Sequence, residues 1–159
     1  MNILVISDTH GNMDLLNSVL DANIDCDTII HLGDNYADLD NCGHLLEDKN
    51  VHKVPGIFHP DYLNGKLPPE ELIKIENKQI LLVHSKKDIS KKADLFLFGH
   101  THEWEISNSK KGIFLNPGHL RAKTEKGRTA SYALMEIKNN KFHIQLLDFQ
   151  HKKFLEATI

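Results

Sequence analysis

The chain has 159 residues, of which 40% are hydrophobic and 26% are charged, and its formal net charge at pH 7 is -3 with neutral histidines. This length predicts one domain, residues 1–159, with a core large enough to fold without disulfides. The negative balance excludes a nucleic-acid binder that works through a basic surface, so we expect no stable nucleic-acid complex. A small phosphate-bearing substrate held by a metal remains compatible with this charge.

Cysteine usage and hydropathy indicate the compartment. Cys26 and Cys42 are the only cysteines, and they form no Cys-x-x-Cys pair. No signal peptide is expected at the N-terminus, and no apolar run approaches the roughly 20 residues that span a bilayer. We therefore expect a reduced, cytoplasmic protein with no membrane partner, and homo-oligomer formation remains open.

The first half of the chain alternates apolar runs with helical patterns. A helix is expected from Met13 to about Ala22, because its leucines and valine share one stripe and Asn12 is a suitable N-cap. The other expected elements are strands at 2–7, 28–32 and 51–54 and a helical stretch at about 39–46. Each strand ends in a polar loop, so the pattern predicts a mostly parallel sheet with its sites at the carboxyl ends of the strands.

The second half is mainly β. A proline- and glycine-rich stretch at 55–69 predicts a long irregular loop, and a loop of this length favours a functional role. The strands expected beyond it are 72–76, 79–83, 95–98, 103–107, 113–116, 130–137 and 142–149. These hairpins favour a second sheet that faces the first one, within an α/β (α+β) fold.

Side chains that bind metals stand at the ends of successive strands. His100 and His102 follow the apolar run that ends at Phe98, and residues two apart in an extended segment point the same way. The complete set is Asp8, His10, Asp34, His84, His100 and His102. Each has an ordinary alternative role, such as capping a turn for Asp or packing in the core for His84. Their joint placement at strand ends favours a metal centre.

The ligand types narrow the choice of ion. Four imidazoles and two carboxylates disfavour calcium, and the cysteines lie elsewhere, which excludes a zinc-thiolate site. Divalent manganese, iron, zinc, cobalt or nickel would fit. Six ligands suit two ions that share a carboxylate, an arrangement that activates a bridging water for in-line attack on a phosphoryl group.

The ordered motifs Asp8-x-His10, Gly33-Asp34, His84 and Gly99-His100-Thr101-His102 resemble those of the calcineurin-like metallophosphoesterases, in particular the small single-domain phosphodiesterases. The resemblance covers nearly the whole chain. It implies a four-layer αββα sandwich of two mixed β-sheets flanked by helices. It also implies two divalent transition-metal ions, with manganese as the first choice, and a small phosphodiester or phosphomonoester substrate attacked by a bridging hydroxide.

Matching positions assign roles within this resemblance. The first ion would be held by Asp8, His10 and His102, and the second by His84 and His100. Asp34 would bridge the two ions and act in catalysis. The segment Asn116-Pro117-Gly118-His119 resembles the family's Asn-Pro-Gly-Ser turn, with a histidine in place of the serine. The candidates for substrate contact are Asn12, Asn35, His119 and Arg121, although a solvated loop position is an equal alternative for the arginine.

Two departures from the family pattern affect the second ion. The family's Gly-Asn segment after the third strand is replaced by Gly56-Ile57-Phe58-His59, so the usual asparagine ligand is missing. We expect His59 to complete this position as a metal ligand near the reaction, with Asp61 and Asn64 as competitors and a solvated loop histidine as the alternative. The family's His-Gly is His84-Ser85 here, and the helix expected after it is short.

Three functions follow from these observations. The first is a metal-dependent phosphodiesterase or phosphatase. The second is a non-catalytic interaction module, because the resembled family also includes a membrane-coat subunit that keeps the fold and loses catalytic residues. The third is a protein that binds one metal ion without hydrolysis. His31, inside an apolar strand, is expected to be a buried, hydrogen-bonded histidine outside the metal centre.

Overall fold

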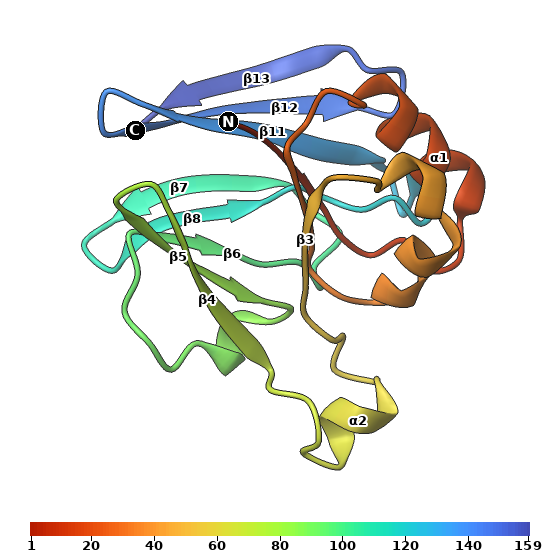
Figure 1. Cartoon of the computed structure of the whole chain (residues 1–159), viewed down its shortest axis with the longest axis horizontal. Coiled ribbons are helices and arrows are strands. Elements are labelled where there is room, and N and C mark those ends of the chain that lie inside the picture. The colour runs from red at the N-terminus through yellow and green to blue at the C-terminus, as the bar shows by residue number, and fades with distance from the viewer.

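Two mixed β-sheets pack against each other in the computed structural model, which describes residues 1–159 (Figure 1). The first sheet has six strands in the order β13-β12-β11-β1-β2-β3, with β1, β2 and β3 parallel and the other pairs antiparallel. Their bounds are β1 Asn2–Ile6, β2 Thr28–His31, β3 Asn50–Lys53, β11 Ser131–Lys138, β12 Lys141–Asp148 and β13 Lys153–Thr158.

The second sheet has five strands in the order β4-β5-β6-β8-β7, and its three central strands are parallel. Their bounds are β4 Glu70–Ile75, β5 Lys78–Val83, β6 Leu95–Leu97, β7 Glu105–Ser109 and β8 Gly112–Asn116. A separate two-stranded hairpin is formed by β9 (Thr124–Glu125) and β10 (Arg128–Thr129). The mixed α/β class with two sheets, predicted from the sequence, is therefore confirmed.

Helices are few and short. Helix α1 (Met13–Ala22) has the predicted bounds, and the side chain of Asn12 caps it by accepting a hydrogen bond of 3.2 Å from the Leu15 N–H. The helical stretch expected at about 39–46 is formed by two 3-10 helices, η1 (Tyr36–Asn41) and η2 (Gly43–Leu45), rather than by a regular α-helix. Aspartates, an asparagine and a glycine interrupt this stretch, and such residues compete with or weaken a regular helix.

The stretch 55–69 contains the short helix α2 (Pro60–Leu63), which projects away from the two sheets (Figure 1). The segment after His84 holds only the 3-10 helix η3 (Lys86–Asp88), in line with the expected shortening. The helical layer on the second sheet is thus much thinner than the layer that α1 provides on the first. None of the helices is long and apolar enough to cross a membrane.

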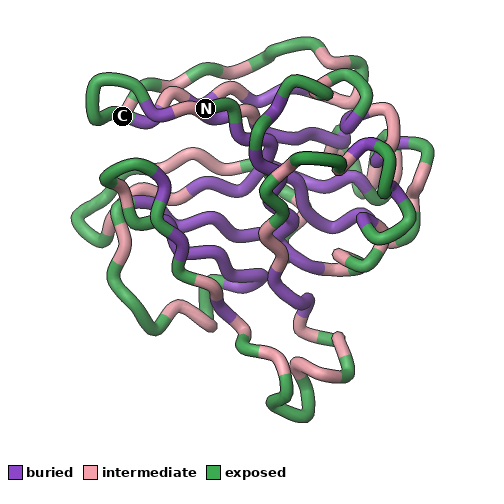
Figure 2. Tube along the Cα trace, viewed as in Figure 1, coloured by how far each residue is buried: buried purple, intermediate pink, exposed green.

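The main core lies between the sheets. It contains 18 buried hydrophobic residues drawn mainly from both sheets, and a second cluster joins α1 to the outer face of the first sheet (Figure 2). The α1 residues in that second cluster are the predicted stripe, Leu15, Leu16, Val19 and Leu20. Burying each of these apolar side chains stabilises the fold by roughly 1.5–3 kcal/mol. This packing holds the start of α1, and the loop before it, on the sheet.

Backbone hydrogen bonds connect the loops at the carboxyl ends of both sheets. The Asp8 N–H donates to the Gly33 carbonyl at 3.0 Å, which joins the loops after β1 and β2. The Gly99 N–H donates to the His84 carbonyl at 3.0 Å, which joins the loops after β6 and β5. The His100 N–H donates to Asp8 Oδ2 at 3.1 Å and links the two sheets. The predicted ligand loops therefore meet at one edge of the sandwich.

Candidate metal centre

Four of the predicted ligands form one cluster. Asp8, His10, Asp34 and His102 each offer a ligand atom, and these atoms all lie within 4.8 Å of one another. The Nε2 atoms of His10 and His102 are 3.2 Å apart, and His102 Nε2 lies 3.3 Å from Asp8 Oδ1. His10 Nε2 lies 3.5 Å from Asp34 Oδ2. The cluster has the mixed nitrogen and oxygen donors that first-row transition metals accept.

An unusual backbone conformation produces this convergence. Five predicted ligands have positive φ angles, which are +54° for Asp8, +47° for His10, +55° for Asp34, +71° for His100 and +58° for His102. Residues other than glycine adopt positive φ angles rarely, at a cost of about 1–3 kcal/mol each. Such strain is concentrated at functional sites, where the surrounding fold holds the conformation.

Asp8 is fully buried and presents one free oxygen. Its Oδ2 accepts hydrogen bonds from the Ser7 hydroxyl at 2.5 Å and from the His100 N–H at 3.1 Å. Its Oδ1 is buried without a hydrogen-bond partner. Burial by itself raises the pKa of this carboxyl group, but the facing imidazole of His102, the charge of His84 and the hydrogen bond from Ser7 outweigh burial and lower the pKa. The side chain is therefore a carboxylate.

A second group of ligands lies on the other side of Asp34. Asp34 Oδ1 is 3.5 Å from Nε2 of His84, a fully buried residue. His84 Nδ1 donates to the Leu32 carbonyl at 2.7 Å, so Nε2 carries the lone pair of the neutral ring and has no hydrogen-bond partner. The His100 ring is 5.1 Å from the His84 ring. The two oxygens of Asp34 thus face two different sets of imidazoles.

These residues fit divalent metal ions. Asp8 Oδ1 and His84 Nε2 are buried acceptors without partners, and each such group is expected to destabilise the fold by about 1–3 kcal/mol. A cation bound in each ligand set would satisfy these two atoms, Asp8 Oδ1 in the first set and His84 Nε2 in the second. Burial also lowers the pKa of His10, which keeps this imidazole neutral and able to coordinate.

His59 lies outside the cluster of four. Its Nδ1 accepts a hydrogen bond of 3.1 Å from the Asp61 N–H and so caps α2, and its ring stacks on Tyr36 at 5.3 Å. The preceding Gly56 does approach the metal centre, because a Cβ there would lie 2.7 Å from the Asp34 nitrogen. Metal binding by His59 therefore stays a prediction.

The predicted substrate residues occupy different environments. The Asn12 side chain has two structural partners, since its Oδ1 caps α1 and its Nδ2 donates to the Arg121 carbonyl at 2.9 Å. Asn35 is exposed and left-handed, and the Arg121 side chain is half-exposed. His119 is fully buried, with its ring 5.4 Å from His102. The exposed pair, Asn35 and Arg121, remains the better placed to meet a substrate.

Sequence reasoning missed two carboxylates. Asp38 Oδ2 accepts from the Thr9 hydroxyl at 2.7 Å and the Gly11 N–H at 2.8 Å, and so holds the loop that carries Asp8 and His10. Glu125 is hydrogen-bonded to His102 Nδ1. No sequence motif marks either residue. Asp38 lies in η1, away from any strand end, and Glu125 lies in β9, 23 positions along the chain from His102.

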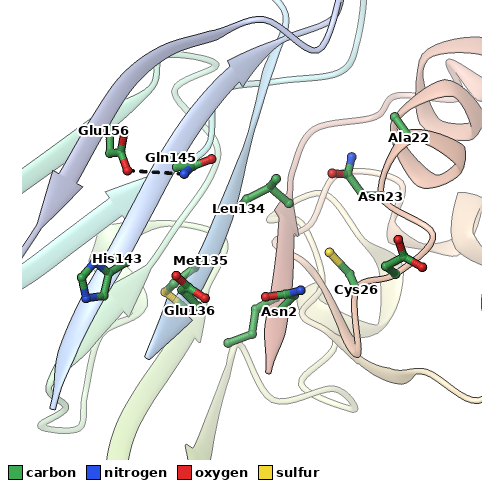
Figure 3. A pocket seen from close by; sticks show the side chains of 12 residues that line it. Asn2, Ala22, Asn23, Cys26, Leu134, Met135, Glu136, His143, Gln145 and Glu156 are labelled. Atoms are coloured by element: carbon green, nitrogen blue, oxygen red, sulfur yellow. Dashed lines mark hydrogen bonds between the residues drawn. The ribbon is translucent and has the colours of Figure 1, made fainter. Parts of the chain in front are cut away.

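A cavity of about 350 Å³ lies on the first sheet, away from the metal centre (Figure 3). It begins beside Asn2, at the opposite end of β1 from Asp8. Its lining includes the carboxylates Asp25, Glu136 and Glu156 and no lysine or arginine. This charge would repel a phosphate group, so the cavity does not compete with the metal centre as a phosphate site.

Residues 1–140 match the calcineurin-like phosphoesterase superfamily domain. The chain belongs to this superfamily. A relative described as a probable metallophosphoesterase, YsnB of Bacillus subtilis strain 168, is 27% identical over 162 residues, which is 93% of this chain and 91% of the relative. The superfamily resemblance stated from the sequence motifs is therefore confirmed.

Solved structures share the fold of this phosphoesterase domain. A predicted phosphoesterase from Streptococcus pneumoniae TIGR4 has a TM-score of 0.73 at 23% identity, with 99% of this chain and 96% of that chain covered. Vacuolar protein sorting 29 from Cryptosporidium parvum has a TM-score of 0.74 at 21% identity, with 99% and 97% covered. Likeness at these identities shows the fold alone.

Proposed function

We propose that this chain is a phosphodiesterase that depends on two divalent transition-metal ions, with manganese as the first choice. The observation that carries the proposal is the position of Asp34. Its Oδ2 lies 3.5 Å from His10 Nε2 in the first ligand set, and its Oδ1 lies 3.5 Å from His84 Nε2 in the second. A carboxylate shared in this way suits a pair of metals, whereas a structural role would need only one partner.

The ligand sets are unequal in completeness. Asp8, His10, Asp34 and His102 would hold the first ion, and Asp34, His84 and His100 the second, with His59 as the proposed addition. When bound, the ions supply Lewis acidity, which lowers the pKa of a water molecule and stabilises charge on a phosphoryl group during in-line displacement. The protein's own contribution is to hold the imidazole and carboxylate side chains of each ligand set toward one ion position.

The rim of the centre is suited to a small substrate. The His10 side chain keeps 26% of its surface exposed, so the centre is open to solvent on that side. Asn35 and Arg121 lie exposed on flanking loops, where an amide and a guanidinium can bind phosphate oxygens. We therefore propose a small phosphodiester substrate, or a phosphomonoester, for a single-domain cytoplasmic enzyme.

Hydrolysis of an aryl phosphodiester tests this proposal. Chelator-treated protein is compared with the same sample after manganese is added back. We expect turnover only in the reconstituted sample, and Asp34→Asn protein prepared in parallel controls for a contaminating hydrolase. Equal turnover in the chelated and reconstituted samples would contradict the proposal.

The second candidate is a non-catalytic interaction module. The replacement of the family's Gly-Asn by Gly56-Ile57 favours it, since the second ligand set then lacks an amide. The structural likeness to vacuolar protein sorting 29 supports it at the level of the fold. Metal binding at the cluster without turnover of aryl phosphodiesters or monoesters would favour this candidate over the enzyme.

A further inference from the structure

The hairpin formed by β9 and β10 carries a carboxylate to the metal centre. Glu125, at the end of β9, is hydrogen-bonded through Oε2 to His102 Nδ1, and only 16% of its side chain is exposed. Its other oxygen, Oε1, lies 3.0 Å from the Arg121 guanidinium. Both oxygens of Glu125 thus have partners, and its carboxylate lies between the Arg121 guanidinium and the His102 imidazole.

This contact determines how His102 faces the cluster. The Glu125 carboxylate accepts a hydrogen bond from the N–H at Nδ1 of His102. In the neutral ring the lone pair therefore lies on Nε2. The Nε2 atom is the one that lies 3.3 Å from Asp8 Oδ1 and 3.2 Å from His10 Nε2. In metal sites of known type, such a carboxylate partner orients the ring and makes it a stronger ligand, and its loss weakens metal affinity about 10–100-fold.

We propose that Glu125 is a positioning residue for the first metal ion. It holds His102 in the tautomer and orientation that present Nε2 to the ion, and Arg121 holds Glu125 in turn. This inference rests on the proposed metal centre and adds a residue that belongs to no motif of the family pattern. It also gives a role to the β9-β10 hairpin, which brings Glu125 to His102.

A purely structural role for this hairpin contact has a matched control. Glu103 makes an ion pair of 3.2 Å with Arg128 of β10 and so fastens the same hairpin. Although Glu103 follows His102 in the chain, its carboxylate makes no hydrogen bond or ion pair with a predicted ligand. Its side chain is 64% exposed. If Glu125 only fastened the hairpin, then Glu103→Gln and Glu125→Gln would have similar effects on metal binding.

Calorimetric titration of chelator-treated protein with Mn²⁺ tests the proposal without relying on activity. We expect Glu125→Gln to weaken the tighter binding step about 10–100-fold. Glu125→Asp, which keeps the charge on a shorter side chain, should recover part of that loss, and Glu103→Gln should match the wild type. Thermal unfolding in chelator monitors the fold of each variant.

Three outcomes would overturn the inference. In the first, Glu125→Gln protein that is folded in chelator binds Mn²⁺ as tightly as the wild type does. In the second, Glu103→Gln loses as much Mn²⁺ affinity as Glu125→Gln. A wild-type chain that binds no ion would overturn both this inference and the proposed function. A wild type that binds Mn²⁺ tightly but hydrolyses nothing would refute only the proposed function, and the comparison of variants would still decide the role of Glu125.

Discussion

Gly99 permits a close approach between the loop after β6 and the loop after β1, and Gly99→Ala should therefore be strongly destabilising. A Cβ at this position would lie 2.8 Å from Asp8 Oδ2 and 3.1 Å from Ser7 Cβ, and closer still to Ser7 Oγ. Asp8 and Ser7 are both fully buried, so neither can move aside into solvent. The alanine must push the loop after β6 away from the loop after β1.

Two effects set the magnitude. Overpacking a well-packed site destabilises by typically about 1–3 kcal/mol. Moving the loop also lengthens the 3.1 Å hydrogen bond from the His100 N–H to the Asp8 carboxylate, and hydrogen bonds to charged groups contribute about 1.5–3 kcal/mol. We expect a combined loss of about 3 kcal/mol or more, which for a chain of this length lowers Tm by roughly 6–12 °C.

Thermal and urea unfolding in the presence of chelator measure this effect without any contribution from bound metal. Gly43→Ala is the matched control, because a Cβ at Gly43 would meet nothing within 4 Å. That variant should be unchanged or more stable by up to about 1 kcal/mol. If Gly99→Ala unfolds at the same temperature as Gly43→Ala, the close packing of the two loops is refuted.

Three further predictions concern the ligands and a buried histidine. Asp34→Asn should reduce phosphodiester turnover more than Asp8→Asn or His102→Ala does, because only Asp34 faces both sets of imidazoles, at 3.5 Å each; equal losses in steady-state assays would argue against a shared carboxylate. His59→Ala should leave a folded protein that has lost the second ion and most of its activity. Unchanged metal content by elemental analysis would show that His59 only caps α2. Burial lowers the pKa of His31 to about 3, so as pH falls below about 6.5 the unfolded chain binds a proton that the native chain does not. The native state should lose about 1.4 kcal/mol per pH unit from this group, and urea unfolding at two acidic pH values should show a smaller loss in His31→Asn; equal losses would contradict this assignment.

Local pattern predicted much of the fold. The apolar run at β1 and the stripe of α1 were read correctly because buried strands and amphipathic helices each have a distinct period. The helical stretch expected at about 39–46 is present as two 3-10 helices, because its aspartates, asparagine and glycine weaken a regular helix. Strand β13 was missed because it is a largely exposed edge strand of mixed polar and apolar sequence, and the hairpin β9-β10 because each of its strands has only two residues.

The candidate site was predictable to the extent that its residues stand at strand ends. Asp8, His10, Asp34 and His102 meet because parallel strands gather their carboxyl ends at one edge, which is a property of topology that sequence order reveals. Glu125 was not predictable in the same way. It lies 23 positions along the chain from His102, in a two-residue strand, and no sequence pattern predicts a contact between two such positions.

The position of a bound ion tests directly whether the four clustered side chains form a metal site. Crystals of the wild-type chain grown with Mn²⁺ can be measured at a wavelength where manganese scatters anomalously. We predict a strong anomalous peak bounded by Asp8, His10, Asp34 and His102, and a second, weaker peak between Asp34, His84 and His100. Anomalous density elsewhere, with none among Asp8, His10, Asp34 and His102 at saturating Mn²⁺, would contradict it.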